Sequence, residues 1–367
     1  MCETALSTHD LSAGYGRNVV ISGVEITAER GKILTLIGPN GSGKSTIIKT
    51  LCRELSPIGG TVFIGKNDLK NLSGNELAKT VSLLLTGRVR TEYMRCLDVV
   101  ETGRYPYTDR LGILSEHDRA KVAEAIKEVD IEDIIYRDFE KISDGQRQRV
   151  LLAGAICREP DVLILDEPTT FLDIKYKLEL MSILKKLAYE KKTTIIMSLH
   201  ELDLAQRISD TILCIKGDRP DLIGTPDEIF SNGYIEELYG VKNGSFCESF
   251  GSPELESIKD VPDVFVIGGG GKGIPVYRHL QRMRVSFAAG IIHENDIEFP
   301  VASALASELI TEKAFEAVSQ ESYEKALKLM KKCSSVICAA ERFGAMNERC
   351  HMLLEEAGKV GLLRKEY

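Results

Sequence analysis

A short run near the start of the chain has the residue types and the spacing that bind phosphate groups. It reads Gly38-Pro39-Asn40-Gly41-Ser42-Gly43-Lys44-Ser45-Thr46 and fills the pattern G-x-x-x-x-G-K-[ST]. Glycines let the backbone turn its N–H groups inward around an anion, and a helix that starts there adds the positive end of its dipole. The Lys44 ammonium would neutralise the β- and γ-phosphates, and the Ser45 hydroxyl would ligate Mg²⁺. We therefore predict a nucleoside triphosphate site formed by Gly38 and residues 40–46.

The residues around this loop predict the elements that position it. Residues 33–37 form an apolar run that reads as a buried strand, and residues 46–51 follow the loop with helical spacing. A second apolar run, 162–165, ends in Asp166 and Glu167. Carboxylates that follow a strand of a parallel sheet lie at its carboxyl edge, where nucleotides bind. We expect Asp166 in the Mg²⁺ shell and Glu167 to polarise the attacking water, although two acids after a strand can also simply begin a turn.

Further motifs resemble those of the ATP-binding subunits of ABC transporters, over residues 6–229. The run Ile142-Ser143-Asp144-Gly145-Gln146 is similar to the family's signature, LSGGQ, with Ile142 and Asp144 as departures. Tyr15 matches the aromatic residue that stacks on adenine, Asp173 the acid of the D-loop, and His200 the switch histidine. Taken singly, Tyr15 could be a turn residue and His200 a histidine at a strand end. Their order along the chain favours the family roles.

The resemblance implies an α/β fold, a P-loop ABC ATPase domain with a helical subdomain at about residues 87–157. It implies Lys44, Glu167 and His200 as catalytic residues, and ATP and Mg²⁺ as cofactors. It also implies a head-to-tail dimer around two ATP molecules, in which Ser143, Gly145 and Gln146 of one copy contact the γ-phosphate held by Lys44 of the other. A site of this kind can be divided between two copies because hydrolysis depends mainly on positioning and charge neutralisation.

One position departs from the family pattern. After the strand predicted at residues 81–85 the family places a glutamine, but this chain has Thr86 and contains no glutamine between residues 55 and 139. The resemblance assigns that glutamine contacts with Mg²⁺ and the attacking water, and a link to the membrane partner. Thr86 keeps an oxygen with a shorter reach. We therefore expect hydrolysis that is slower, or more dependent on the partner, than is usual in the family.

Membrane partners and cargo also follow from the resemblance. It implies permease subunits at the cytoplasmic face of the cell membrane and, indirectly, a substrate-binding protein. Residues 102–107, Thr-Gly-Arg-Tyr-Pro-Tyr, and 115–118, Ser-Glu-His-Asp, are similar to importers of iron-siderophores, haem and cobalamin. Physically, this segment predicts only a turn-rich bridge between helices. The choice between cobalamin and an iron chelate stays open.

Composition narrows the classes of function. The chain has 47 basic and 55 acidic residues and a formal net charge of −8, so it lacks the basic footprint of a nucleic-acid-binding protein. Its 9 cysteines contain no C-x-x-C pair, which is typical of reduced thiols in a cytosol. No apolar run approaches the roughly 18 residues that span a bilayer, and residues 1–10 lack the basic segment of a signal peptide. We therefore expect membrane contact through a separate subunit.

The chain is long enough for a second domain, since its 367 residues exceed what one core usually serves. We predict the ATPase domain at residues 1–242, a linker rich in Gly, Ser and Pro at 243–262, and a small Rossmann-like α/β domain at 263–367. In this last part, strands are predicted at 263–267, 285–292 and 335–339, and helices at 274–283, 301–307, 320–332 and 346–357.

A second glycine pattern opens the predicted C-terminal domain. Gly268, Gly270 and Gly273 satisfy G-x-G-x-x-G between a strand and a helix, and Glu294 and Asp296 follow about twenty residues later. This is the arrangement of a dinucleotide site, but glycines also occur where the backbone must merely turn tightly. Both interpretations stay open.

Three classes of function are consistent with the sequence. The first is the energy-coupling ATPase of an importer. The second is a soluble ABC ATPase of DNA repair or translation, although such proteins usually carry two cassettes or long coiled coils. The third is an enzyme or ligand sensor whose chemistry lies in the C-terminal domain and is regulated by the ATPase.

Overall fold

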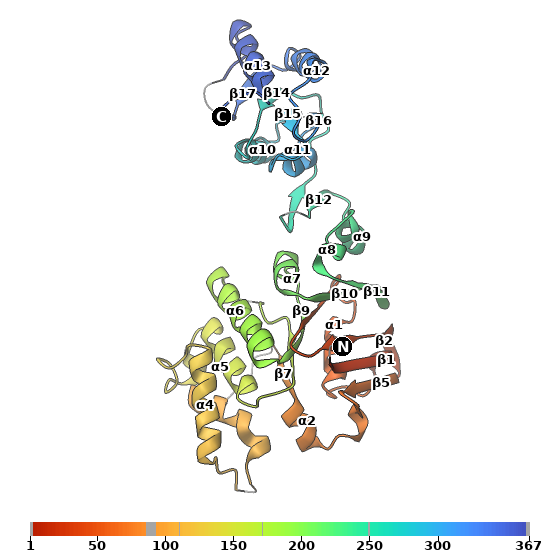
Figure 1. The fold of residues 1–367 in the computed structure, drawn as a ribbon, viewed down its shortest axis with the longest axis vertical. Helices are drawn as coiled ribbons and strands as arrows, with labels where there is room; N and C mark the ends of the chain where they lie inside the picture. The colour runs from red at the N-terminus through yellow and green to blue at the C-terminus, as the bar shows by residue number, and fades with distance from the viewer. Residues whose placement is uncertain (1–2, 86–92, 110, 171, 249, 365–367) are drawn as a thin grey trace. The chain divides into compact units, whose positions relative to one another are not determined.

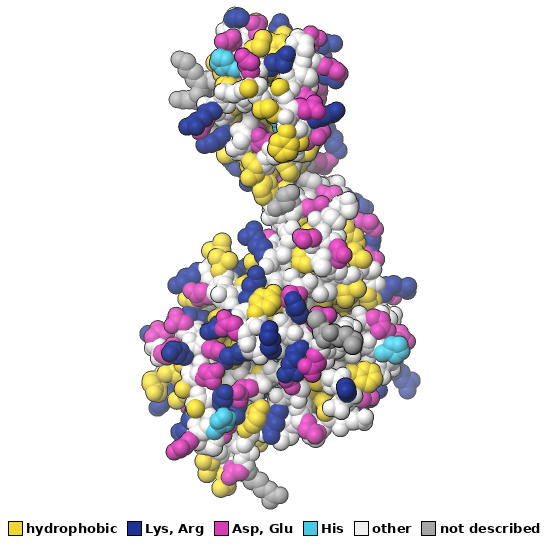
Figure 2. Space-filling view, in the orientation of Figure 1, with side chains coloured by type: hydrophobic (Ala, Val, Ile, Leu, Met, Phe, Trp, Pro, Cys, Tyr) yellow, Lys and Arg dark blue, Asp and Glu magenta, His cyan; other side chains and the backbone are white. Residues whose placement is uncertain are grey.

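The fold is described from a computed structural model, which covers residues 3–85, 93–109, 111–170, 172–248 and 250–364. The chain divides into two compact units, Met1–Tyr239 (unit 1) and Gly240–Tyr367 (unit 2) (Figure 1). The division falls slightly before the predicted end of the ATPase domain at residue 242. On the face of unit 1 shown in Figure 2, basic and acidic side chains are interspersed, and neither charge forms an extended stripe there.

Unit 1 is built on a six-stranded sheet whose strands carry the predicted motifs at one edge. Its order is β11 (Arg219–Gly224), β10 (Thr211–Lys216), β4 (Ile33–Ile37), β9 (Thr194–Ser198), β8 (Val162–Asp166) and β7 (Val81–Leu85). All neighbours are parallel except β11, which is antiparallel to β10. Every residue of β4, β8 and β9 is buried, as expected for apolar strands covered on both faces. Gly38, Glu167 and His200 therefore follow their strands at the same carboxyl edge.

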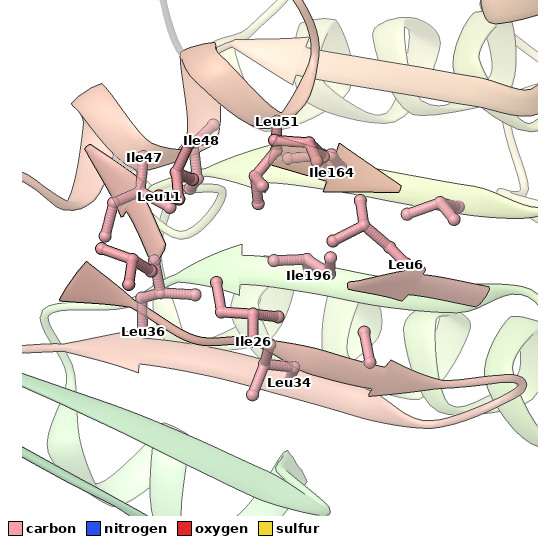
Figure 3. Close-up of a cluster of buried hydrophobic side chains, with 14 of the residues drawn as sticks. Leu6, Leu11, Ile26, Leu34, Leu36, Ile47, Ile48, Leu51, Ile164 and Ile196 are labelled. Atoms are coloured by element: carbon pink, nitrogen blue, oxygen red, sulfur yellow. The ribbon is translucent and has the colours of Figure 1, made fainter. Parts of the chain in front are cut away.

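A smaller antiparallel sheet covers one face of the first. It contains β2 (Asn18–Val24), β1 (Thr4–Tyr15), β5 (Gly59–Ile64) and β6 (Asn67–Asp68), with β3 (Thr27–Glu29) paired to β1. Helix α1 (Lys44–Leu51) joins both sheets in one core, in which Ile47, Ile48 and Leu51 contribute to a fully buried cluster (Figure 3). Burying each such side chain contributes roughly 1.5–3 kcal/mol, so the core fixes the helix on which the glycine loop ends.

The helical subdomain lies between β7 and β8 in the chain and, in the described residues, contains α3 (Cys96–Glu101), α4 (Glu116–Glu128) and α5 (Asp144–Ile156) with the 3-10 helices η2 (Thr102–Tyr107) and η3 (Phe139–Lys141). The other helices of unit 1 are η1 (Leu69–Asn71), α2 (Gly74–Thr80), α6 (Ile174–Lys191), α7 (Leu202–Ile208), α8 (Pro226–Ile229) and α9 (Tyr234–Tyr239).

The segment that resembles metal-chelate importers, residues 102–107, has a structural role in this subdomain. Arg104 is fully buried and donates to the Asp118 carboxylate of α4 at 2.9 Å. A Cβ on Gly103 would lie 2.1 Å from the carbonyl oxygen of Gly154 in α5. The glycine and the arginine therefore lock η2 between α4 and α5.

Unit 2 is a doubly wound α/β domain, which confirms the predicted fold class. Its parallel sheet has the order β16 (Glu308–Glu312), β15 (Phe287–His293), β14 (Val264–Ile267) and β17 (Ser335–Cys338). Helices α10 (Gly273–Arg282) and α11 (Phe299–Leu305) cover one face, and α12 (Gln320–Met330) and α13 (Glu348–Lys359) cover the other (Figure 1). Alternate residues of β14 enter the two cores, Val264 and Val266 on one side and Phe265 and Ile267 on the other.

One expectation for this region needs correction, and one strand was not predicted. The predicted linker at residues 243–262 contains an antiparallel hairpin, β12 (Gly244–Cys247) and β13 (Ser252–Leu255). The hairpin belongs to unit 2 because the buried Glu254 pairs with Arg278 of α10 and Phe250 packs on the core beneath α10 and α11. Strand β16 was not predicted, since it is a short edge strand with a glutamate at each end and only partial burial.

Candidate functional site

The glycine loop of unit 1 has the backbone conformation of an anion cradle. Gly41 and Gly43 have φ of 81° and 97°, in the left-handed region that favours glycine. A Cβ on Gly38 would lie 2.4 Å from the carbonyl oxygen of Ile215 in β10. Gly43 is the N-cap of α1, so the loop leads directly into the unpaired N–H groups of the first helical turn. The predicted phosphate loop is thus formed as a turn that only glycines allow at these positions.

Lys44 is held over this loop. Its side chain is 4% exposed, and its Nζ donates to the carbonyl oxygens of Gly38 at 2.7 Å and Pro39 at 3.0 Å. Burial lowers the pKa of Lys44, while the nearby Glu167 and Asp166 carboxylates oppose that shift. An arriving phosphate would supply stronger acceptors than the two carbonyls.

Two serines hold the Asp166 carboxylate beside the loop. Asp166 Oδ1 accepts from Ser45 Oγ at 3.1 Å and from Ser198 Oγ at 2.7 Å. The Ser198 hydroxyl also accepts from the backbone N–H of Glu167 at 2.9 Å. Sequence reasoning missed Ser198; the signal was a polar residue at the end of an otherwise apolar strand. The paired oxygens of Ser45 and Asp166 fit the preference of Mg²⁺ for oxygen ligands.

Glu167 stands next to His200 at the same edge. Its backbone has φ of 50°, a left-handed conformation that is uncommon outside glycine. His200 Nε2 lies 2.6 Å from Glu167 Oε1, and Thr170 Oγ1 donates to the other carboxylate oxygen at 3.4 Å. The structure therefore brings together the two residues predicted from separate motifs.

A cavity joins these groups. Its volume is about 420 Å³, and it is lined by Tyr15, Val20, Asn40, Gly41, Gly43, Lys44, Ser45, Thr46, Glu167 and His200. Tyr15 is 51% exposed, which leaves its ring accessible at the cavity. Ser42 does not line the cavity, but its hydroxyl is buried and has no hydrogen-bond partner within the described part of the chain.

The signature residues and Asp173 lie outside this cavity, at the starts of α5 and α6 respectively. Ser143 caps α5 and forms a reciprocal capping box with Gln146. A Cβ on Gly145 would lie 2.7 Å from the Tyr176 ring, and Asp173 caps α6 by accepting from the Tyr176 N–H at 3.0 Å. Asp144 forms an ion pair with Arg147 at 2.7 Å. Thr86 lies outside the described residues.

Comparison with known proteins identifies the family. Residues 21–170 match the family model described as ABC transporter. Over 287 residues the chain is 42% identical to an uncharacterised ABC transporter ATP-binding protein of Methanocaldococcus jannaschii, covering 78% of this chain and 99% of that protein. The chain belongs to the ATP-binding subunits of ABC transporters. It is therefore an ATPase, and the prediction of an ABC ATPase fold is confirmed.

Other relatives of this ABC ATPase are named for a transport function or have solved structures. A probable siderophore transport system ATP-binding protein of Bacillus subtilis is 35% identical over 65% of this chain and 86% of that protein. A dimeric ATP-binding cassette bound to ADP and Pi has a TM-score of 0.53 at 25% identity, covering 60% of this chain and 98% of that chain. ATP-binding cassettes related to this chain thus bind ADP and form dimers.

The second unit of this ABC ATPase also has matches among known proteins. The Methanocaldococcus jannaschii match is longer than unit 1, which ends at Tyr239, so it continues into unit 2. Residues 287–366 match a model described as the MJ0874 family. Over the described residues, no helix is long and apolar enough to cross a membrane.

The glycine loop of unit 2 is filled by the protein's own carboxylates. The N–H of Gly270 donates to Asp296 at 2.8 Å, and the N–H of Gly273 donates to Glu298 at 2.8 Å. A Cβ on Gly268 would lie 2.0 Å from Glu298, and one on Gly273 would lie 2.4 Å from Tyr277. Tight packing therefore accounts for Gly268 and Gly273, and a φ of 66° accounts for Gly270, which favours the structural interpretation over a dinucleotide site.

Proposed function

We propose that this chain energises the import of an iron-siderophore by hydrolysing ATP beneath a separate permease. The observation that carries the proposal is the cavity where Lys44, Ser45 and Glu167 meet at the glycine loop, with the Asp166 carboxylate bonded to Ser45. Relatives named for siderophore transport, such as the one from Bacillus subtilis, support the cargo class. Cobalamin and haem are alternative cargoes. The permease, a substrate-binding protein and a place at the cytoplasmic membrane face belong to the same proposal.

The chemistry follows from the positions of the side chains. Tyr15 stacks on the adenine, and Lys44 with the loop N–H groups binds the β- and γ-phosphates. Glu167 accepts a proton from water as the water oxygen bonds to the γ-phosphorus, while the bond to the β–γ bridging oxygen breaks and leaves ADP and phosphate. His200 orients the Glu167 carboxylate. Mg²⁺ held by Ser45 and Asp166 would neutralise phosphate charge.

A second copy completes the site in this proposal. The signature residues 143–146 and Asp173 lie outside the cavity, yet the resemblance assigns them to the γ-phosphate and the dimer interface. The related dimeric cassette supports a symmetric pair of chains. The capping box at Ser143 lies at the start of α5, where helix N–H groups favour an anion. In the proposed dimer, this end of α5 faces the γ-phosphate held by the partner.

The test replaces the proposed base. With Glu167→Gln in the full chain, we expect ATP binding to persist and hydrolysis to fall on the order of 100-fold or more. An ATP-bound dimer should accumulate and be visible by size-exclusion chromatography with light scattering. Glu132→Gln, at an exposed position of the helical subdomain, is the matched control and should hydrolyse ATP normally. Normal hydrolysis by Glu167→Gln would contradict the assignment.

A further inference from the structure

The first residue of the phosphate loop is held by a side chain from the far end of unit 1. The N–H of Gly38 donates to the hydroxyl oxygen of Tyr239 at 3.1 Å, across 201 positions of sequence. Tyr239 is half-buried and is the last residue of α9. Burial raises the pKa of its phenol to about 12, so it stays neutral and can accept this bond.

Among the described residues, the Gly38 N–H bonds to the Tyr239 hydroxyl and not to an atom of the loop itself. The carbonyl of Gly38 accepts from Lys44, which must turn toward phosphate when ATP binds. Ile215 restricts the other side of Gly38, because no side chain fits there. The Tyr239 hydroxyl therefore holds the junction of β4 and the loop through the Gly38 N–H. This contact does not depend on the position of the Lys44 side chain.

Helix α9 is itself tied to the sheet that carries the loop. Glu237 pairs with Lys216 of β10 at 2.7 Å, and the Tyr234 hydroxyl donates to Asp221 of β11 at 2.7 Å. The hydroxyl of Tyr239 is thus held in place by two anchors on neighbouring strands. Gly240, the next residue, begins unit 2, so the contact lies where the chain leaves the ATPase.

We propose that Tyr239 is a positioning residue for the phosphate loop, and that its hydroxyl keeps the loop in the conformation that binds ATP. The inference rests on the proposed role of the loop in binding ATP. Removing the hydroxyl leaves the N–H of Gly38 without its acceptor, and the loop can relax before the nucleotide arrives. The loss falls on nucleotide binding, since Tyr239 touches none of the groups assigned to proton transfer.

The experiment compares two hydroxyl deletions on one helix. In the full chain, Tyr239→Phe should raise the KM for ATP about fivefold, with kcat changed less than about twofold. Tyr234→Phe removes a hydroxyl that bonds Asp221 instead of the loop; because Glu237 still ties α9 to β10, KM should rise less than about twofold. Direct titration with a fluorescent ATP analogue should show the same difference, and thermal melts should show both variants folded.

Two results would overturn the inference. One is a KM for Tyr239→Phe equal to that of the unaltered chain; the other is an equal rise in both variants, which would show a general effect of loosening α9. Measuring Glu167→Gln in parallel separates failure of the Tyr239 inference from failure of the proposed function. If Glu167→Gln hydrolyses ATP normally, the proposed chemistry fails, whatever Tyr239→Phe does to nucleotide binding.

Discussion

Two loops of this molecule share one local pattern and differ in what they hold. Each follows a buried strand with parallel neighbours, is rich in glycine and leads into a helix; the first loop has three glycines and the second has five. The loop after β4 faces a cavity of about 420 Å³. The loop after β14 faces Asp296 and Glu298, which accept its N–H groups. A glycine loop is an anion site only where the protein's own carboxylates do not fill it.

The strand order explains this difference. In unit 1 the acids follow β8, and β9 separates β8 from β4, which leaves room beside the loop. In unit 2 the acids follow β15, which is the direct neighbour of β14. Asp296 and Glu298 therefore reach the loop N–H groups without a strand between them. The residues that decide the function of each loop lie outside the glycine motif.

The largest expected effect separates the lysines of the two loops. Lys44→Ala should lower ATP hydrolysis on the order of 100-fold or more, since it removes the cation at the phosphates. Lys272→Ala is the matched control; its exposed ammonium pairs with Glu341 at 2.8 Å, so hydrolysis should not change. Calorimetric titration of Lys44→Ala with ATP and with NAD⁺ should then show that unit 2 binds neither nucleotide. Tight binding of NAD⁺ would contradict the conclusion that Asp296 and Glu298 fill the glycine loop of unit 2.

The next effect tests why unit 2 needs its glycines. Gly273→Ala should destabilise unit 2 by about 2–3 kcal/mol, because its Cβ would lie 2.4 Å from Tyr277 and 2.8 Å from Glu298. Gly358→Ala in α13 is the control, since a Cβ there meets no atom within 4 Å and alanine favours a helix. Urea denaturation measures both variants. If Gly273→Ala were as stable as the unaltered chain, packing would not explain the glycine.

The sequence predicted unit 1 well because each motif there coincides with the element that positions it. Strands β4, β8 and β9 are buried and mostly apolar; Asp166 ends β8, and the loop, Glu167 and His200 follow their strands within two residues. Ser198 was missed because its role depends on Asp166 and Glu167, which are 32 and 31 residues away. A contact of this kind appears only once the strands are paired.

Unit 2 was predicted only in outline. Its glycine motif was recognised, but the outcome depended on where Asp296 and Glu298 would lie after β15 became the neighbour of β14. The hairpin of β12 and β13 was mistaken for a linker, because four-residue strands with Gly, Ser and Pro carry no period of their own. Tertiary packing through Glu254 and Phe250 orders it.

A smaller effect concerns Ser198, which holds Asp166 and Glu167 in place beside the loop of unit 1. Ser198→Ala should lower kcat about tenfold, near 1.4 kcal/mol, because Asp166 and the strained backbone of Glu167 both lose a partner. Ser82→Ala on β7 is matched, as Ser82 is equally buried but its hydroxyl has no partner among the described residues. Steady-state ATPase assays distinguish them. Equal kcat values in the two variants would show that Ser198 does not position the acids.

The smallest effect is a pH dependence in the stability of unit 2. Burial raises the pKa of Glu298, against hydrogen bonds from Tyr277 and Gly273 that lower it. The folded state therefore binds the proton more tightly than the unfolded state, and this stability is lost as pH rises through the folded pKa. Glu298→Gln keeps an acceptor for Gly273 and removes the titration, so the melting temperature of the unaltered chain should fall relative to that of Glu298→Gln as the pH rises above about 4.5, the ordinary pKa of a glutamate. All other carboxylates are common to both proteins, so they cancel in the difference. A difference in melting temperature that stays constant with pH would mean that Glu298 titrates normally and that its carboxylate fills the loop at no electrostatic cost.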